Sequence, residues 1–168
     1  MNMFRPSSLA AALAAALLSL PSVFAGSVRI GDAFPDLAGA GFEGRLPDLA
    51  GKIVIVDFWA SWCVPCKKAL PMYAGLQKEY GDRGVVVVAI SLDEEKDKME
   101  AFLKKIPLPF STVRDAKGQF AEKVGVTGIP TSYVLTPDGK VHALHREFEG
   151  EKTRRKLTVE LDAILKSK

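Results

Sequence analysis

The chain has 168 residues, of which 48% are hydrophobic and 26% are charged, and it carries a formal net charge of +3. This length suits one globular domain, and the composition excludes a disordered or collagen-like chain. The charge gives no reason to expect nucleic acid as a partner, because nucleic-acid binding usually shows as many clustered basic residues. We interpret the single basic run, Arg154-Arg155-Lys156, as a solvated helix face.

Residues 1–25 have the pattern of a cleavable signal peptide. Arg5 supplies a positive charge, residues 9–20 form an apolar run rich in Ala and Leu, and Val23-Phe24-Ala25 offers small residues to a signal peptidase. The apolar run is shorter than the roughly 20 residues that span a bilayer. We therefore predict a signal peptide at 1–25, one domain at 26–168, and export to a bacterial periplasm. The alternative is an uncleaved N-terminal membrane anchor.

After residue 30, apolar residues recur with strand and helix periods in turn. Residues 31–51 are rich in Gly, Pro and Asp, and we expect turns there with a short edge hairpin at 41–46. We predict strands at 52–59, 84–92, 110–114, 131–136 and 140–148, and helices at 64–81, 93–105, 119–124 and 150–166. Pro137-Asp138-Gly139 is typical of a turn that joins the last two strands. Strands that alternate with helices and end in a hairpin predict an α/β sandwich around a mixed sheet.

The chain has two cysteines, Cys63 and Cys66, which lie three residues apart. A disulfide that closes so small a ring stabilises the fold little, because it removes little loop entropy from the unfolded chain. The pair therefore indicates a reactive site rather than a structural cross-link. The pair follows a predicted buried strand and opens a predicted helix, where free amide groups and a partial positive charge stabilise a thiolate. We therefore expect Cys63 to be the nucleophile and Cys66, one turn further in, to be more buried and to resolve a mixed disulfide. Pro65 lies where the first turn of a helix tolerates proline.

Asp57 is the one charged residue in the apolar Ile53–Trp59 part of the predicted strand. Burial disfavours a carboxylate, so it should raise the pKa of Asp57 and favour the neutral form. Two interpretations remain open at this point. Either the side chain reaches water or a backbone donor, or it serves the cysteines as a proton acceptor.

The stretch from Val56 to Lys67, VDFWASWCVPCK, closely resembles the active-site signature of the thioredoxin superfamily. Pro71 matches the proline within that family's active-site helix, and Gly128-Ile129-Pro130-Thr131 resembles its cis-proline loop. An extra strand and helix before that loop, together with YVLTPDG at 133–139, resemble the TlpA/ResA-like exported disulfide reductases. The resemblance implies a thioredoxin-like α/β fold with a mixed central sheet flanked by helices. It also implies a strand–helix insertion before the cis-proline loop and an N-terminal extension.

The same resemblance implies roles for single residues. Asp57 would accept the proton of Cys66, although the predicted strand at 84–92 lacks the lysine with which thioredoxins often pair this acid. A cis Ile129–Pro130 bond would leave the Ile129 backbone free to pair with an extended substrate and would block metal capture. We expect Trp62 to be an exposed surface on which partner proteins dock.

These observations predict an exported thiol–disulfide oxidoreductase. Between the cysteines, Val64-Pro65 lacks the histidine that is typical of strong oxidants, which favours a reductant recharged by a membrane thiol carrier. The clients implied by the resemblance are apocytochrome c, a copper-delivery protein for cytochrome oxidase, or other exported proteins with oxidised cysteines. We expect a monomer that needs no cofactor beyond the Cys63–Cys66 disulfide and binds no nucleic acid.

Two alternatives use the same cysteines differently. A zinc site would need further ligands, and His142 and His145 are the only candidates in the sequence. Residues three apart in a strand point to opposite faces, so these two histidines should not bind one metal ion together. We expect both to be surface or edge residues. We therefore predict no metal site. Transient Cu(I) binding by a docking module with this fold remains open, because soft thiolates suit Cu(I). A peroxiredoxin-like antioxidant is disfavoured, because Val56 and Ala60 stand where its Pro-x-x-x-Thr-x-x-Cys pattern has proline and threonine.

Overall fold

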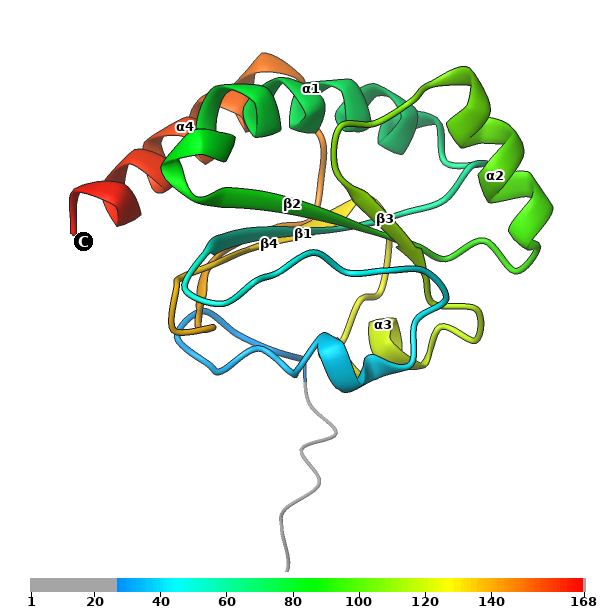
Figure 1. The fold of residues 1–168 in the computed structure, drawn as a ribbon, viewed down its shortest axis with the longest axis horizontal. Helices are drawn as coiled ribbons and strands as arrows, with labels where there is room; N and C mark the ends of the chain where they lie inside the picture. Colours follow the sequence, from blue (N-terminus) through cyan, green and yellow to red (C-terminus); the bar gives the residue numbers. More distant parts are fainter. Residues whose placement is uncertain (1–26, 168) are drawn as a thin grey trace, which may run out of the picture.

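The computed structural model describes residues 27–167, which form a five-stranded mixed sheet with helices on both faces (Figure 1). The predicted signal peptide lies outside the described residues. The strands are β1 (Ile53–Trp59), β2 (Val85–Ser91), β3 (Ser111–Arg114), β4 (Thr131–Leu135) and β5 (Val141–His145). The helices are α1 (Val64–Tyr80), α2 (Lys96–Lys105), α3 (Gln119–Val124) and α4 (Glu151–Lys166), with short 3-10 turns at Ala38–Ala40 and Gly81–Arg83.

The strand order is β3-β2-β1-β4-β5, so β1 is the central strand of the sheet. β1, β2 and β3 run parallel, whereas β4 is antiparallel to β1 and β5 is antiparallel to β4. All seven residues of β1 are buried, as a near-continuous apolar run predicts for a strand covered on both faces. This arrangement confirms the predicted thioredoxin-like fold.

The two faces of the sheet are covered by different parts of the chain. α1, α2 and α4 lie on one side in Figure 1, and α3 and the N-terminal segment lie on the other. Because successive strand residues point to opposite faces, Ile53 and Ile55 pack with α1 and α4, whereas Val54, Val56 and Phe58 pack on the opposite side. The same alternation places Asp57 on the face of the sheet that α1 and α4 cover.

The extra strand and helix predicted before the proline loop are β3 and α3. The predicted hairpin of the last two strands is also present, and its turn ends at Gly139, whose φ of 79° suits a glycine. The N-terminal extension runs along the sheet and contacts it through two isolated bridges, Ala33 with Lys140 and Glu43 with Arg114. Between residues 27 and 167, no helix is long and apolar enough to cross a bilayer.

Two sequence predictions of elements are wrong in detail. Residues 41–46 form no hairpin with each other; instead, Glu43 exchanges both backbone hydrogen bonds with Arg114 and so pairs with the open edge of β3. The helix predicted from residue 93 begins at Lys96. Its expected first carbonyls, those of Asp93 and Glu94, accept hydrogen bonds from the Arg114 side chain.

Candidate active site

Cys63 and Cys66 are joined by a disulfide at the N-terminus of α1, directly after the central strand. Cys63 is the N-cap residue, and the backbone amide of Cys66 donates a hydrogen bond to its sulfur at 3.2 Å. This geometry confirms the expected position of Cys63 at the start of the helix, where the amide of Cys66 points at its sulfur. Such an environment stabilises negative charge on Cys63 when the disulfide opens.

The two cysteines differ in what surrounds them. Cys66 is 0% exposed and Cys63 is 4% exposed, so Cys63 is the more accessible of the two sulfur-bearing residues. Trp62 and Val64 flank Cys63 and are 65% and 62% exposed, although both are apolar. Cys63 is therefore flanked in the chain by two exposed apolar side chains, Trp62 and Val64, which we call the docking rim.

The proline loop lies beside the cysteines. The Ile129–Pro130 peptide bond is cis, and the Ile129 side chain packs against the buried cluster that contains Cys63 and Cys66. The Thr131 hydroxyl donates to the carbonyl of Gly128 at 2.6 Å and closes the loop. The structure thus brings the Ile129–Pro130 bond beside the cysteine pair, which directly follows Trp62, although more than sixty residues separate the two segments in sequence.

Two further prolines shape α1. Pro65 occupies its first turn, where a missing amide hydrogen leaves no helical bond unmade. Pro71 lies inside the helix, whose residues continue on to Tyr80. Because proline cannot donate to the carbonyl four residues earlier, Pro71 removes one bond from the turn that follows the cysteines.

Asp57 is 0% exposed and lies on β1 beneath α1. Neither of its carboxyl oxygens has a hydrogen-bond partner among residues 27–167, so it reaches neither water nor a backbone donor there. Burial raises the pKa of Asp57 well above its ordinary value, and the nearby Tyr73 hydroxyl offsets only part of this rise. The structure therefore buries Asp57 as the sequence predicts, and this burial raises its pKa.

A second buried acid, Asp93, holds the active-site loop and was not singled out from the sequence. Its carboxylate accepts hydrogen bonds from the Ser61 amide at 2.9 Å, the Ser61 hydroxyl at 2.6 Å and the Ser91 hydroxyl at 2.8 Å. Asp93 is 1% exposed, and Ser61 stands two residues before Cys63. Asp93 therefore fixes the turn that carries the cysteine pair.

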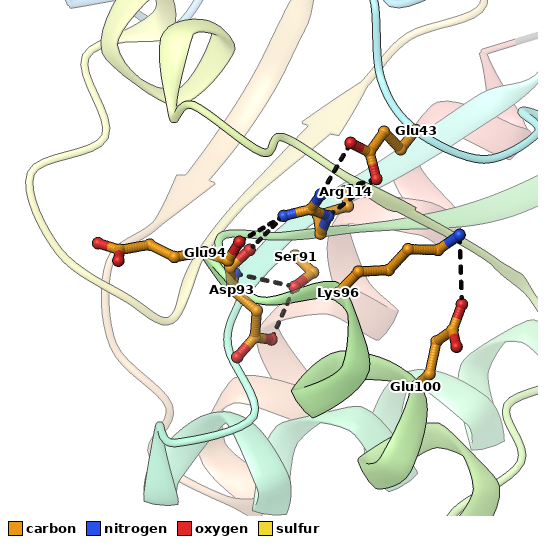
Figure 2. Close-up of polar contacts among 7 residues, drawn as sticks. All are labelled: Glu43, Ser91, Asp93, Glu94, Lys96, Glu100 and Arg114. Atoms are coloured by element: carbon orange, nitrogen blue, oxygen red, sulfur yellow. Dashed lines mark hydrogen bonds and ion pairs between the residues drawn. The ribbon is translucent and has the colours of Figure 1, made fainter.

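Arg114 in turn holds the loop that carries Asp93 (Figure 2). Its guanidinium donates to the carbonyls of Asp93 and Glu94 at 3.2 and 2.7 Å and makes a two-pronged ion pair with Glu43 at 2.7 and 3.1 Å. The Arg114 side chain is only 9% exposed, so these contacts satisfy a buried charge. Polar residues at the carboxyl ends of β2 and β3, Ser91 and Arg114, were the signal that could have indicated this cluster.

The two histidines lie on β5, at the edge of the sheet. His145 is not a surface residue, because its side chain is only 11% exposed and its Nε2 lies 2.8 Å from a carboxylate oxygen of Glu160 on α4. The expectation that both histidines are surface or edge residues is confirmed by their place on the edge strand β5, where α4 partly covers His145. Within residues 27–167, no group of three or more His, Cys, Asp or Glu side chains is placed to hold a metal ion.

The sequence matches the AhpC/TSA family over residues 30–144. It is 34% identical over 140 residues to thiol-disulfide oxidoreductase ResA of Bacillus thuringiensis subsp. konkukian, which covers 82% of this chain and 79% of that protein. It is also 35% identical over 125 residues to ResA of Bacillus subtilis, covering 71% and 70% of the two chains. A solved structure from Chlorobium tepidum, assigned as a thiol:disulfide interchange protein DsbE, superposes with a TM-score of 0.76 at 35% identity, covering 83% of this chain and 99% of that one.

Proposed function

Since this chain belongs to the AhpC/TSA family and is a thiol–disulfide oxidoreductase with a thioredoxin-like fold, we propose that it reduces disulfides in exported client proteins. The observation that carries the proposal is the Cys63–Cys66 pair at the N-terminus of α1, beside the exposed docking rim. An enzyme that reduced only small soluble disulfides would need no exposed apolar side chains beside its nucleophile. An apolar rim next to the accessible sulfur suits a protein client, because it removes apolar area from water when the client docks.

Reduction of a client proceeds in two exchange steps. The Cys63 thiolate attacks one client sulfur, a new sulfur–sulfur bond forms, and the other client sulfur leaves as a thiolate. Asp57 then takes the proton of Cys66, and the Cys66 thiolate attacks the sulfur of Cys63. The Cys63–Cys66 disulfide forms, and the second client sulfur leaves with its electron pair. Two electrons pass from the enzyme to the client, through sulfur alone.

Docking brings the client disulfide to Cys63 by two kinds of contact. The docking rim, Trp62 and Val64, provides exposed apolar area next to Cys63 in the chain. The backbone of Ile129, before the cis proline, pairs with an extended client segment in the manner of an added strand. The clients proposed from the family resemblance are apocytochrome c, a copper-delivery protein or other exported proteins with oxidised cysteines.

The location and the electron supply follow from the same proposal. Residues 1–25 act as a cleavable signal peptide that delivers the chain to the periplasm, with an uncleaved anchor as the alternative. That compartment is kept oxidising, so a reductase there needs its own electron source. A membrane thiol carrier supplies it: one carrier thiolate attacks Cys63, Cys66 leaves as the thiol, and the second carrier thiolate releases Cys63.

The direction of electron flow is testable as a reduction potential. Because the Val64-Pro65 dipeptide carries no histidine to stabilise the reduced form, we expect a value near the −270 mV of thioredoxin, and below about −200 mV. The potential is measured by equilibrating the protein with mixtures of reduced and oxidised dithiothreitol and following tryptophan fluorescence. A value near the roughly −120 mV of a strong oxidant would show that the enzyme introduces disulfides instead.

A further inference from the structure

A row of polar side chains crosses the sheet beneath α1 and α4. In the strand registers, Asp57 of β1 lies opposite Ser132 of β4, and Ser132 lies opposite His145 of β5. Directly opposite residues in an antiparallel pair have Cβ atoms about 5 Å apart and point to the same face. The row therefore leads in two steps from the buried acid beneath α1 to the edge of the sheet.

Two residues from the covering helices complete the row. The Tyr73 hydroxyl, on α1, lies beside both Asp57 and Ser132; burial and then the charge of Asp57 raise the pKa of Tyr73 well above its ordinary value. Glu160, on α4, places a carboxylate oxygen 2.8 Å from Nε2 of His145. On the opposite side of Asp57, the facing residue of β2 is Ala89, which carries no charge.

The row also runs from the interior toward water. Asp57 is 0% exposed and Ser132 is 1% exposed, whereas the side chains of His145 and Glu160 are 11% and 21% exposed. Both Asp57 carboxyl oxygens and the Ser132 hydroxyl have no hydrogen-bond partner within the described chain. Buried polar atoms without partners are costly, so their alignment in one row calls for a function.

We propose that Ser132, His145 and Glu160 form a proton path that connects Asp57 with solvent, and that the Tyr73 hydroxyl positions the Asp57 carboxyl at its inner end. The inference rests on the proposed function, in which Asp57 takes the proton of Cys66. A buried carboxyl that has just been protonated cannot serve the next cycle until it releases that proton. Asp57 lies beneath α1, the helix that begins with the disulfide, and the polar row leads from it toward the edge of the sheet.

Each transfer along the path moves one proton and no electron. In the structure the Ser132 hydroxyl is hydrogen-bonded to neither Asp57 nor His145, so rotation of its side chain must first bring it within hydrogen-bond distance of both. The Asp57 O–H bond then breaks as its proton passes to the Ser132 oxygen, while the original Ser132 hydroxyl proton passes to one ring nitrogen of His145. The imidazolium then releases the proton on its other nitrogen to the Glu160 carboxylate, which gives it to water. The exchange of sulfur–sulfur bonds involves none of these residues except Asp57. The proton path therefore affects the rate of the exchange reaction but not its products.

The path is tested by watching the two exchange steps separately. Reduced protein is mixed with dithionitrobenzoate in a stopped-flow instrument. Attack by Cys63 releases a first coloured thiolate and leaves a mixed disulfide, and attack by Cys66 on that disulfide releases a second. The first phase does not require deprotonation of Cys66, whereas the second phase does, so only the second phase depends on Asp57 and its path.

For Ser132→Ala we expect an unchanged first phase and a second phase slowed about three- to tenfold at pH 7, a modest part of what a proton-transfer group contributes. Glu160→Gln should slow the same phase. The difference in second-phase rate between these variants and wild type should disappear as the pH rises past the ordinary thiol pKa of about 8.5, because hydroxide then deprotonates Cys66 directly. Ser132→Thr, which keeps the hydroxyl, should restore the rate, and Glu151→Gln, an exposed acid on the same helix, should leave it unchanged.

Second-phase rates equal to wild type in both Ser132→Ala and Glu160→Gln, from about pH 6 to about pH 9, overturn the path. A deficit that is the same at every pH also overturns it, because structural damage would not be relieved by hydroxide. If Asp57→Asn leaves the second phase unchanged as well, the error lies in the proposed role of Asp57. If wild-type protein shows no second phase, the error lies in exchange through Cys66 itself.

Discussion

Replacing Cys63 with serine is expected to reduce the rate of insulin reduction by about a thousandfold or more, to the background set by dithiothreitol. A serine hydroxyl is not ionised at neutral pH, so the amides at the start of α1 have no thiolate to stabilise. Cys66 cannot substitute, because it is 0% exposed and lies behind Cys63. Turbidity from precipitating insulin chains measures the rate.

The matched control for Cys63→Ser is Lys68→Ser, an exposed residue one turn further along α1, which should reduce insulin at the wild-type rate. Circular dichroism of both variants checks that the helix remains. Turnover by Cys63→Ser above about a tenth of the wild-type rate would contradict the assignment of Cys63 as the nucleophile.

The Asp57→Asn variant is expected to slow the attack of Cys66 on a mixed disulfide by about ten- to a hundredfold at pH 7 while leaving the first attack by Cys63 unchanged. An amide cannot accept the Cys66 proton, and it has nearly the same shape as the carboxyl it replaces. The two phases of thionitrobenzoate release report the two steps. Equal slowing of both phases would indicate a distorted site rather than a lost proton acceptor.

The same variant should change how stability depends on pH. Burial raises the pKa of Asp57 in the folded protein, whereas the unfolded chain has a pKa of about 3.9. Below that value both states are protonated; as the pH rises, the unfolded state loses its proton first and wild-type stability falls. Asp57→Asn escapes this loss, so its advantage over wild type should be on the order of 1–3 kcal/mol larger at pH 8 than at pH 4. Urea unfolding measures it; an advantage that shrinks as the pH rises would refute a buried neutral carboxyl.

Local sequence patterns predicted the elements that carry the cysteines. These elements are neighbours in sequence: the apolar strand β1 is followed by Cys63-Val64-Pro65-Cys66 and the start of α1. The spacing of apolar residues, the helix-start signals and the spacing of the cysteines therefore predict them together. The elevated pKa of Asp57 followed from one charge in an apolar strand. The cis bond at Pro130 came from family resemblance alone, because few X–Pro bonds in proteins are cis.

The parts that were missed depend on long-range pairing. Ser61 and Asp93 are 32 residues apart, and Arg114 and Glu43 are 71 residues apart, so no local pattern connects them. The edge pairing of Glu43 with β3 replaced a predicted hairpin for the same reason. Single-sequence patterns indicate which residues are buried or turned, but the partner of a buried charge depends on which elements the fold brings together.

Two buried acids lie beside the elements that carry the cysteine pair. Asp93 fixes the turn before Cys63 through Ser61, and Asp57 lies beneath α1 on the central strand. The first contact positions the sulfur that meets the client. In the proposed mechanism, Asp57 supplies the proton acceptor for the sulfur that releases the client.

The most direct test of exchange through Cys63 is the mass of a trapped intermediate. Reduced Cys66→Ser protein is incubated with oxidised insulin, separated without reducing agent and analysed by mass spectrometry before and after digestion. The mechanism predicts a stable adduct that carries insulin on Cys63 and disappears with dithiothreitol, because the resolving sulfur is absent. No adduct would contradict the proposal that Cys63 attacks a client disulfide and Cys66 releases it.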